Sequence, residues 1–470
     1  GLGYQIYTVP KGQNLIGTNF KLNPNATLGY SDGTYTYRPD DWYDETFHNS
    51  FRQEYNVSAS GSSDRLRYYA GVGYLKDGGI VNNSEYSRYT GRTNVDYQAK
   101  DWLKLTTNMG FTHSESQSPQ FDVDNWGSSG NLFYICNTMA PIYPLYVRDA
   151  EGNIMTESGR KVYDSNQTNF KRPSVVGNAV RDNEYNRTKG VRDLFNGQWA
   201  AVVTPIEGLS LTASFSATAI NDRNSELYSR YGSAFTVDGQ VKVYNNRIFS
   251  TNQQYLASYS KQLGDHNLSV LAGYEQYNYK TQYLSGTNDH LYNPFVGELS
   301  NASGISQKSL SSYTDSKMNE GFLGRVQYDW QEKYFASASF RRDASSVFAP
   351  GHRWGNFGSA GLAWQMSKED FMKDVKWVDV LKLKLSYGQQ GNDNLSGRTG
   401  FYYRHAYADM YTASYDETTG SYSVTMVQKG NENLTWETSK SWNVGVDFEL
   451  FKHRLTGAIE YYNRATSDML

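Results

Sequence analysis

Polar and apolar residues alternate along most of the chain, in runs of about ten residues separated by turns. The clearest run, residues 381–387, places leucines and a tyrosine on one face of an extended segment and lysines and a serine on the other. A period of two residues is the signature of a β-strand. Similar runs fill residues 321–392 and recur along nearly the whole sequence. The pattern therefore predicts an all-β protein built of two-faced strands.

From residue 51 onward, the runs and turns predict about seven hairpins, or about 14 strands. Turns within hairpins are expected at 61–64, 100–101, 205–208, 263–266, 330–333, 367–380 and 451–453. Long connections between hairpins are expected at 117–190, 223–248, 287–318 and 393–435. Outer-membrane barrels have short turns at one end and long extracellular loops at the other, whereas a soluble sandwich has no reason for this asymmetry. We therefore assign residues 51–470 to a transmembrane antiparallel β-barrel and residues 1–50 to an extended lead-in.

The composition also favours a barrel. The 470 residues include 40 Tyr, 10 Trp and 21 Phe, yet hydrophobic residues reach only 38%. A barrel needs apolar residues only on an outer band, with aromatic girdles at its borders. The alternative is that the rings reflect β-propensity alone. We expect girdle positions at Trp42, Tyr43, Tyr68, Tyr69, Tyr97, Trp102, Trp330, Tyr334, Trp354, Trp364, Trp436, Trp442, Tyr461 and Tyr462.

Charge, cysteine content and motifs argue against several classes of function. The net charge is −3 with both signs well mixed, so no nucleic-acid partner is expected. The single Cys136 excludes an internal disulfide. The sequence has no nucleophile elbow, phosphate-binding loop or zinc-protease motif. We predict that the protein is not an enzyme and has no catalytic residue, cofactor or metal site.

Two groups of polar residues resemble sites but have simpler interpretations. Asp122 and Asp124 resemble the start of a calcium loop, but Phe133 stands where the bidentate glutamate is needed, which favours an ordinary turn. The second group is formed by Arg341, Arg342, Asp343 and Arg353. We expect these charges to face the lumen or the rim of the barrel, because a basic residue facing lipid at mid-bilayer costs about 2–4 kcal/mol.

Aromatic residues in the long loops are the best candidates for contact with a substrate or partner. Rings supply a large contact area at low entropy cost and stack on sugars or pack on peptides. Loops also carry such roles more often than the scaffold does. The alternative is that these rings only pack the loops together. The candidates are Trp126, Phe133, Tyr134, Tyr143, Tyr146, Tyr292 and Phe295.

Several longer segments resemble a known family. The chain reads DWYD at 41–44, RDASS at 342–346, RWG at 353–355, NLTWETS at 433–439 and NVGVDF at 443–448. In this order, over most of residues 41–470, these segments resemble the barrel of SusC/RagA-type TonB-dependent transporters. That family comprises outer-membrane nutrient importers typical of Bacteroidota.

The resemblance implies a barrel of 22 strands, with an N-terminal plug inside it and a TonB box before the plug. Because only about 14 strands can be traced, we expect this chain to be part of a longer protein. The plug and the terminal strands of the barrel are then expected to lie outside it.

The resemblance also implies a function and its partners. We expect a bacterial outer-membrane importer that takes up oligosaccharides or oligopeptides, is covered by a SusD-like surface lipoprotein and is driven by TonB through the plug. The lipid bilayer would surround the wall, and transporter–lipoprotein pairs would form a dimer. One alternative is a passive porin or adhesin barrel without energy coupling. The other is a soluble or secreted all-β enzyme or carbohydrate-binding protein.

Overall fold

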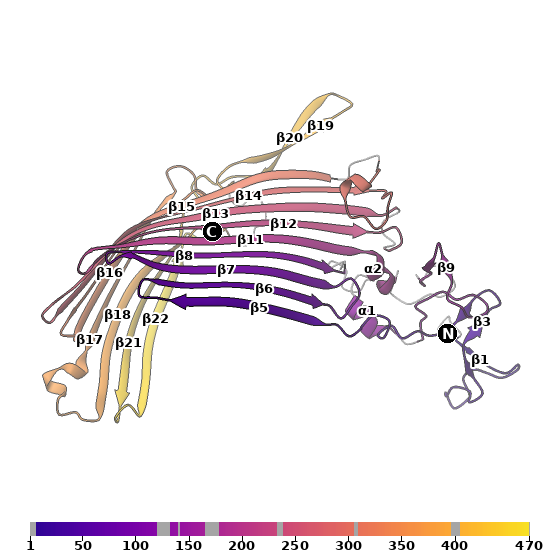
Figure 1. Ribbon diagram of the computed structural model, residues 1–470, viewed down its shortest axis with the longest axis horizontal. Helices are drawn as coiled ribbons and strands as arrows, with labels where there is room; N and C mark the ends of the chain where they lie inside the picture. The colour runs from indigo at the N-terminus through magenta and orange to yellow at the C-terminus, as the bar shows by residue number, and fades with distance from the viewer. Residues whose placement is uncertain are drawn as a thin grey trace.

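The computed structural model describes residues 6–119, 132–139, 142–164, 178–232, 238–304, 309–395 and 405–469. Fourteen strands form one antiparallel sheet whose order follows the chain (Figure 1). The predicted all-β fold and its strand number are confirmed. The strands are β5 (Arg52–Ser62), β6 (Leu66–Gly78), β7 (Glu85–Lys100), β8 (Leu103–Ser118), β11 (Arg187–Ile206), β12 (Leu209–Tyr228), β13 (Gln240–Leu263), β14 (His266–Asp289), β15 (Ser309–Trp330), β16 (Tyr334–Ser345), β17 (Trp354–Gln365), β18 (Val378–Asn392), β21 (Glu437–Leu450) and β22 (Leu455–Ser467).

Smaller elements lie outside this sheet. They are the helices α1 (Leu132–Thr138) and α2 (Ala179–Tyr185), the strand pairs β1–β2 (Tyr7–Thr8, Thr27–Leu28), β3–β4 (Tyr30–Ser31, Thr36–Tyr37), β9–β10 (Thr156–Glu157, Arg160–Lys161) and β19–β20 (Met410–Asp416, Ser421–Gln428), and the 3₁₀ turns η1 (Leu299–Asn301), η2 (Met366–Lys368) and η3 (Asp370–Met372). Both α-helices have only seven residues. None of the described helices has the length and apolarity required to cross a membrane.

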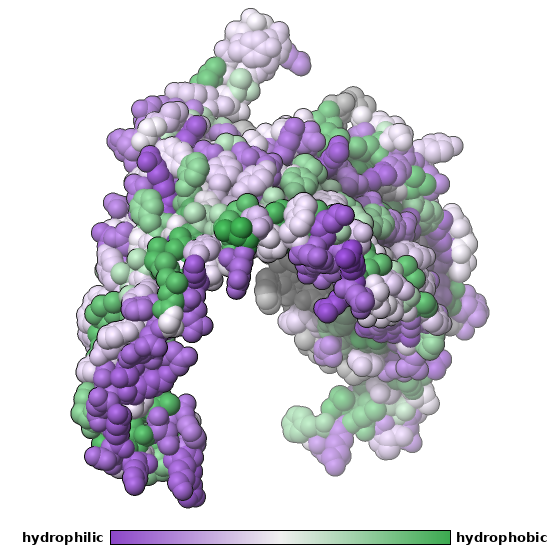
Figure 2. All heavy atoms as spheres, turned by 60° about the vertical axis from the view of Figure 1, so that its left-hand side comes forward, coloured by the Kyte–Doolittle hydropathy of each residue, from purple (hydrophilic) through white to green (hydrophobic). Residues whose placement is uncertain are grey.

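The sheet is strongly curved. Figure 2 shows the molecule as a wide arch around an open hollow. Within the described residues β5 and β22 are the two edges of the sheet, and no ladder joins them. We call the end with the short turns the turn end and the end with the long connections the loop end. Residues 6–50 lie beyond the loop end (Figure 1).

The two faces of the sheet differ in chemistry, as the alternation predicts. On β18, Leu383, Leu385 and Tyr387 are exposed on one face, which we call the outer face. Lys384 belongs to the opposite, inner face, where its ammonium lies 2.7 Å from Asp447 and 3.0 Å from Glu460. Because paired residues on neighbouring strands share a face, the register extends the apolar outer face across the whole sheet.

The apolar part of the outer face has the height of a bilayer core. On β14 it includes Leu268, Val270, Ala272 and Tyr274, and the next outer-face residue is Gln276. The ten residue steps from His266 to Gln276 span about 33 Å along the strand. With the strand tilt of membrane barrels this corresponds to about 25 Å across the bilayer, the usual height of the apolar band.

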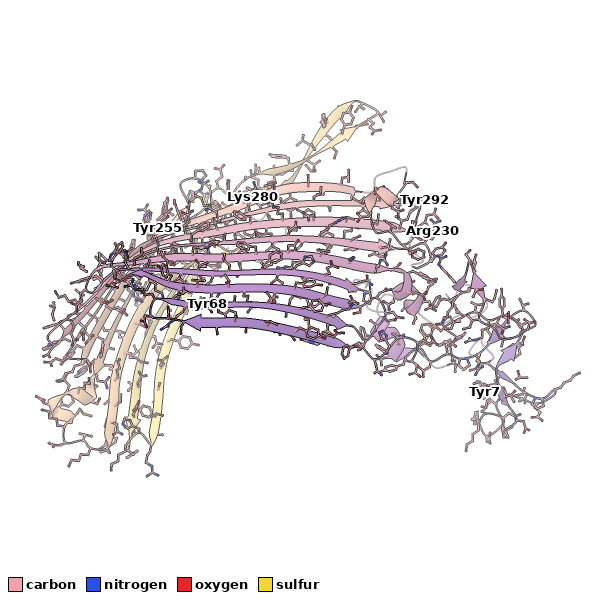
Figure 3. All side chains as sticks on the ribbon, in the orientation of Figure 1. Tyr7, Tyr68, Arg230, Tyr255, Lys280 and Tyr292 are labelled. Atoms are coloured by element: carbon pink, nitrogen blue, oxygen red, sulfur yellow. The ribbon has the colours of Figure 1, made fainter. Side chains whose placement is uncertain are left out.

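Several strands continue far beyond this band towards the loop end. Tyr255 lies within the band, whereas Lys280 lies nearer the loop end (Figure 3). The predicted connections 223–248 and 287–318 were therefore too long, since β12 and β13 reach Tyr228 and Gln240, and β14 and β15 reach Asp289 and Ser309. Outside the membrane both faces of a strand are polar, so the alternation that marks a strand disappears from the sequence.

The predicted aromatic girdle agrees with the ring stacking at the turn end but is wrong for two tryptophans and two tyrosines. Tyr69 and Tyr462 lie on the inner face, because they pair with Ser60 and Asn443. Trp330, Tyr334 and Trp364 stack across neighbouring strands, with ring centroids 5.6 and 6.4 Å apart. Trp42 is only 3% exposed and lies in a core formed by the loops. Trp436 is 9% exposed and packs against Phe348 and Phe357. Proximity to a strand end does not distinguish a lipid-facing ring from one packed beneath a loop.

Candidate functional site

The connections at the loop end form a packed assembly with its own hydrophobic core. This loop-end core joins residues from the lead-in, the β6–β7 turn and the long β8–β11 connection. Partly buried Phe295, from the β14–β15 connection, packs against it. The core residues are Trp42, Val81, Leu132, Cys136, Leu145, Tyr146, Tyr163, Ala179, Val180 and Tyr185. Connections far apart in sequence are therefore held in fixed relative positions.

A buried ion pair fastens the lead-in to this assembly. The guanidinium of Arg148 donates to both carboxylate oxygens of Asp40, at 3.0 and 2.5 Å. The same carboxylate accepts backbone N–H bonds from Leu145 and Tyr146 at 2.7 and 3.2 Å. Both charged side chains are 10% exposed. The hydrogen bonds fill the acceptor capacity of Asp40, as a buried carboxylate requires.

Two further contacts tie the lead-in to the core. The indole N–H of Trp42 donates to the carbonyl oxygen of Tyr143 at 3.0 Å. The hydroxyl of Thr46 lies 2.9 Å from the sulfur of Cys136 on α1. Burial raises the pKa of the Cys136 thiol, so less thiolate forms at any given pH.

Buried tyrosines add polar contacts within the core. Tyr146 donates its hydroxyl hydrogen bond to Glu45 at 2.8 Å, and Tyr163 donates to Glu184. Burial raises the pKa of both phenols, and the neighbouring carboxylates raise it further. Both tyrosines therefore remain neutral donors. Their chemistry is that of structural hydrogen bonds rather than proton transfer.

The predicted contact residues occupy different environments. Phe133 and Tyr134 on α1 are 42% and 47% exposed, and Tyr292 is 88% exposed. Tyr143 and Tyr146 are only 7% and 4% exposed, which matches the alternative that such rings pack the loops together. Trp126 lies outside the described residues.

Phe295 and Tyr292 come from the same connection but differ in setting. Phe295 is half-buried and stacks on Tyr231, and the guanidinium carbon of Arg160 lies 4.4 and 4.8 Å from the centroids of the Tyr231 and Phe295 rings. Arg230 donates to the carbonyl oxygen of Tyr292 at 3.1 Å, and both residues lie at the loop end (Figure 3). A fixed backbone therefore presents the Tyr292 ring to solvent.

The inner face carries a network of paired charges. The Arg341 guanidinium donates to Asp343 at 2.7 Å and to Glu275 at 3.1 Å. Asp393 accepts from Lys317 at 2.8 Å and from Ser345 at 2.7 Å. The prediction that Arg341 and Asp343 face the lumen is confirmed by their register with the inner face.

The other two charges of this predicted group lie at the rim. Arg342 is on the outer face, at the border of the apolar band, and its guanidinium carbon lies 4.9 Å from the centroid of the Trp354 ring. Arg353 donates to the carbonyl oxygen of Phe348 at 3.1 Å, in the connection between β16 and β17. Neither group is placed at mid-bilayer, which agrees with the cost of exposing a charge to lipid.

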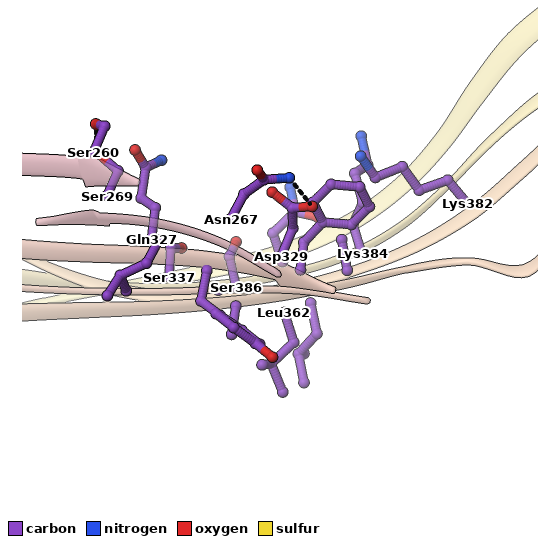
Figure 4. Close-up of a pocket in the computed structure, with 18 of the residues that line it drawn as sticks. Ser260, Asn267, Ser269, Gln327, Asp329, Ser337, Leu362, Lys382, Lys384 and Ser386 are labelled. Carbon is purple, nitrogen blue, oxygen red and sulfur yellow. Dashed lines mark hydrogen bonds between the residues drawn. The ribbon is translucent and has the colours of Figure 1, made fainter. Parts of the chain in front are cut away.

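Towards the turn end, the inner face has a hollow of about 800 Å³ (Figure 4). A row of serines, amides and one glycine runs directly across seven strands, and Ser260 and Gln327 point to the side of the strands opposite Leu362. Nearby, the Asn267 amide donates to the Asp329 carboxylate at 3.0 Å, and Lys384 forms ion pairs with Asp447 and Glu460. The row is Ser260, Ser269, Gln327, Ser337, Gly361, Ser386 and Asn443.

This chemistry suits binding or passage of a polar solute rather than catalysis. The inner face offers hydroxyl and amide groups, and several of its charges, such as those of Lys384 and Arg341, are already paired. Within the described part of the chain, no group of three or more His, Cys, Asp or Glu residues is arranged to hold a metal ion. The sequence patterns did not reveal Asp40, Arg148 or the inner-face row that runs from Ser260 to Asn443. Asp40 and Arg148 are 108 residues apart, so no local pattern links them.

Comparison with known proteins identifies related barrels. The family model described as "TonB dependent receptor-like, beta-barrel" matches residues 143–470. TonB-dependent receptor P3 of Formosa agariphila is 27% identical over 435 residues, covering 92% of this chain and 41% of the relative. TonB-dependent receptor SusC of Bacteroides thetaiotaomicron is 25% identical over 447 residues, covering 92% and 42%. The chain thus spans less than half the length of these relatives.

A solved structure shares the fold. The structure of the RagAB peptide transporter superimposes with a TM-score of 0.72 at 22% identity, covering 92% of this chain and 46% of the solved one. Relatives of this kind are receptors and transporters, which confirms the prediction that the chain is not an enzyme. The similarity to SusC agrees with the SusC/RagA resemblance noted in the sequence. With the family model matching more than half of the chain, the sequence belongs to the TonB-dependent receptor-like β-barrel family.

Proposed function

We propose that this chain forms part of the barrel wall of a nutrient importer in the outer membrane of a Gram-negative bacterium. The observation that carries the proposal is the division of the sheet into two faces. The outer face has an apolar band about 25 Å high, and the inner face presents hydroxyls, amides and paired charges. Such a wall separates lipid from a path for polar solutes.

The two sheet edges support a larger barrel. Unpaired backbone groups of β5 and β22 would cost several kcal/mol each in lipid. Further strands of the complete protein would remove this cost by pairing with both edges. The relatives, which are more than twice as long as the matched region, have room for such strands and for a plug inside the barrel.

The loop-end assembly supports a surface partner. Its core is packed with buried side chains, and Phe133, Tyr134 and Tyr292 are exposed at the loop end. A SusD-like lipoprotein docked there would close the barrel over a captured oligosaccharide or oligopeptide. TonB would then supply energy through the plug. A dimer of such transporter–lipoprotein pairs is part of the same proposal.

Uptake by cells carrying the full-length gene tests the proposal. We expect that deletion of the gene abolishes growth on one class of oligosaccharides or peptides, and that loss of TonB has the same effect. A passive porin would instead support uptake without TonB and conduct ions steadily in a planar bilayer. Steady conductance with TonB-independent uptake would overturn the importer proposal.

A further inference from the structure

An apolar groove of about 380 Å³ lies on the outer face over β15–β18. Its floor is a row of directly paired residues, Tyr328, Ala336, Leu362 and Leu385. Ala336 is small and stands between larger neighbours, so the surface is recessed there. The groove lies entirely within the apolar band that faces lipid.

The recess continues along the two middle strands towards mid-bilayer. The next outer-face residues are Ala338 on β16 and Ala360 and Gly358 on β17, which carry a methyl group or no side chain. Phe340, which is 54% exposed, marks the far end of the recess on β16. The six residue steps from Tyr334 to Phe340 span about 20 Å. One leaflet contributes about half of the 30 Å bilayer core, so the recess accommodates an extended acyl chain.

A fixed set of rings forms the wall at the turn end. The carboxylate of Glu369 accepts hydrogen bonds from the Tyr334 hydroxyl at 2.5 Å and from the Trp364 indole at 2.9 Å. The Phe371 ring meets Trp364 edge-on at 6.3 Å and is itself 62% exposed. Glu369 therefore holds the Tyr334 hydroxyl and the Trp364 indole N–H at the membrane border and leaves the faces of both rings turned to the groove.

The turns beside this wall carry balanced charge. Residues 331–333 and 366–377 contain four lysines and four acidic residues. Two of the ion pairs, Lys333–Glu369 and Lys368–Glu332, lie next to the ring wall. A headgroup with both a phosphate and an ammonium matches such a surface better than an anionic headgroup does.

We propose that this groove binds one acyl chain of a zwitterionic phospholipid from the leaflet at the turn end. The apolar band continues into the groove without interruption, so a lipid tail is the molecule in contact with it. The tail packs on Ala336 and Leu362 between the Tyr328, Tyr334 and Trp364 rings, and the headgroup meets the charged turns. The site is independent of the transported nutrient.

Native mass spectrometry of the full-length protein tests this site. The delipidated protein is titrated with phosphatidylethanolamine or phosphatidylglycerol of identical acyl chains, and bound lipid is counted. Ala336→Phe fills the floor of the groove, and we expect about ten-fold weaker phosphatidylethanolamine binding from the lost burial of the lipid methylenes. Ala213→Phe is the matched control, because Ala213 lies on the outer face of β12 away from the groove.

A second variant adds no bulk. Glu369→Ala removes the acceptor of both ring tips, and we expect it to weaken binding of the same lipid while heat-modifiable migration shows a folded barrel. Equal binding by the Ala336→Phe, Glu369→Ala and Ala213→Phe variants would overturn the site. Equal affinity of the wild-type protein for both lipids would overturn its zwitterionic specificity.

Discussion

Asp40 and Arg148 show how one pair of residues fixes the loop end. Asp40 lies in the lead-in, and Arg148 lies in the connection between β8 and β11. Their side chains are 10% exposed, and the carboxylate also accepts two backbone N–H bonds. A buried ion pair adds little stability over an apolar pair, but removal of one partner leaves an uncompensated charge.

We therefore expect Asp40→Ala to release the lead-in from the loop-end core. Leaving Arg148 unpaired costs about 3–5 kcal/mol locally. Limited proteolysis of the full-length protein should show faster cleavage in residues 6–50, with the barrel still intact by heat-modifiable migration. Asp101→Asn is the control, because its pair with Arg65 is largely exposed and such pairs contribute little. Equal cleavage of both variants would contradict the role of Asp40.

Cys136 provides an internal probe of the same core. The thiol is buried, and desolvation raises its pKa, so the reactive thiolate is scarce and access to it is blocked. We expect slow alkylation of Cys136 at mildly alkaline pH in the wild-type protein and clearly faster alkylation in the Asp40→Ala variant. The alkylated fraction of the peptide that contains Cys136 measures both rates. Rapid alkylation in the folded wild-type protein would show that the loop-end core is open in solution.

At the level of elements, β18 has a close contact at its loop end. A Cβ added at Gly391 would lie 2.1 Å from the Phe357 ring, which is 7% exposed and packs against Trp436. The ring fills the space that a side chain at position 391 would need. Glycine is therefore required here by packing rather than by backbone conformation.

We expect Gly391→Ala to destabilise the barrel by about 1–3 kcal/mol, the usual cost of overpacking a filled site. Thermal or denaturant unfolding of the full-length protein measures this change. Gly91→Ala on β7 is the matched control, because a Cβ there meets no atom within 4 Å, and we expect it to be neutral. Equal effects of the two substitutions would contradict the packing at Phe357.

At the scale of the whole molecule, the outer face defines where the membrane ends. On β14 the change from Tyr274 to Gln276 marks the border on the loop side, and the strand continues to Asp289. The strands therefore form a wall that rises well above the bilayer and supports the loop-end assembly.

Cysteine scanning on β14 locates this border. In intact cells, a membrane-impermeant thiol reagent should label Asn278→Cys but not Ala272→Cys. Both positions are on the outer face, and only the first lies above the apolar band. The two residues are six positions apart on one strand, so any difference in labelling reflects depth in the membrane. Labelling of Ala272→Cys would contradict the placement of the band.

By itself, the sequence determined the all-β fold, the seven hairpins and the outward face of the strands. Alternation such as that of residues 381–387 is local and is imposed by lipid on one side and water on the other. The sequence did not predict the parts of β13 and β14 nearest the loop end, because polar surroundings on both faces of a strand remove the alternation of polar and apolar residues.

Only the tertiary structure decided which loop rings are exposed and which are buried. Tyr146 and Tyr292 look alike as loop aromatics, yet one lies in the loop-end core and the other faces solvent. The difference depends on contacts between segments about 100 residues apart, such as Asp40 with Arg148 and Trp42 with Tyr143. A periodic pattern reports the environment of a strand, whereas packing between distant segments arises only when the chain has folded.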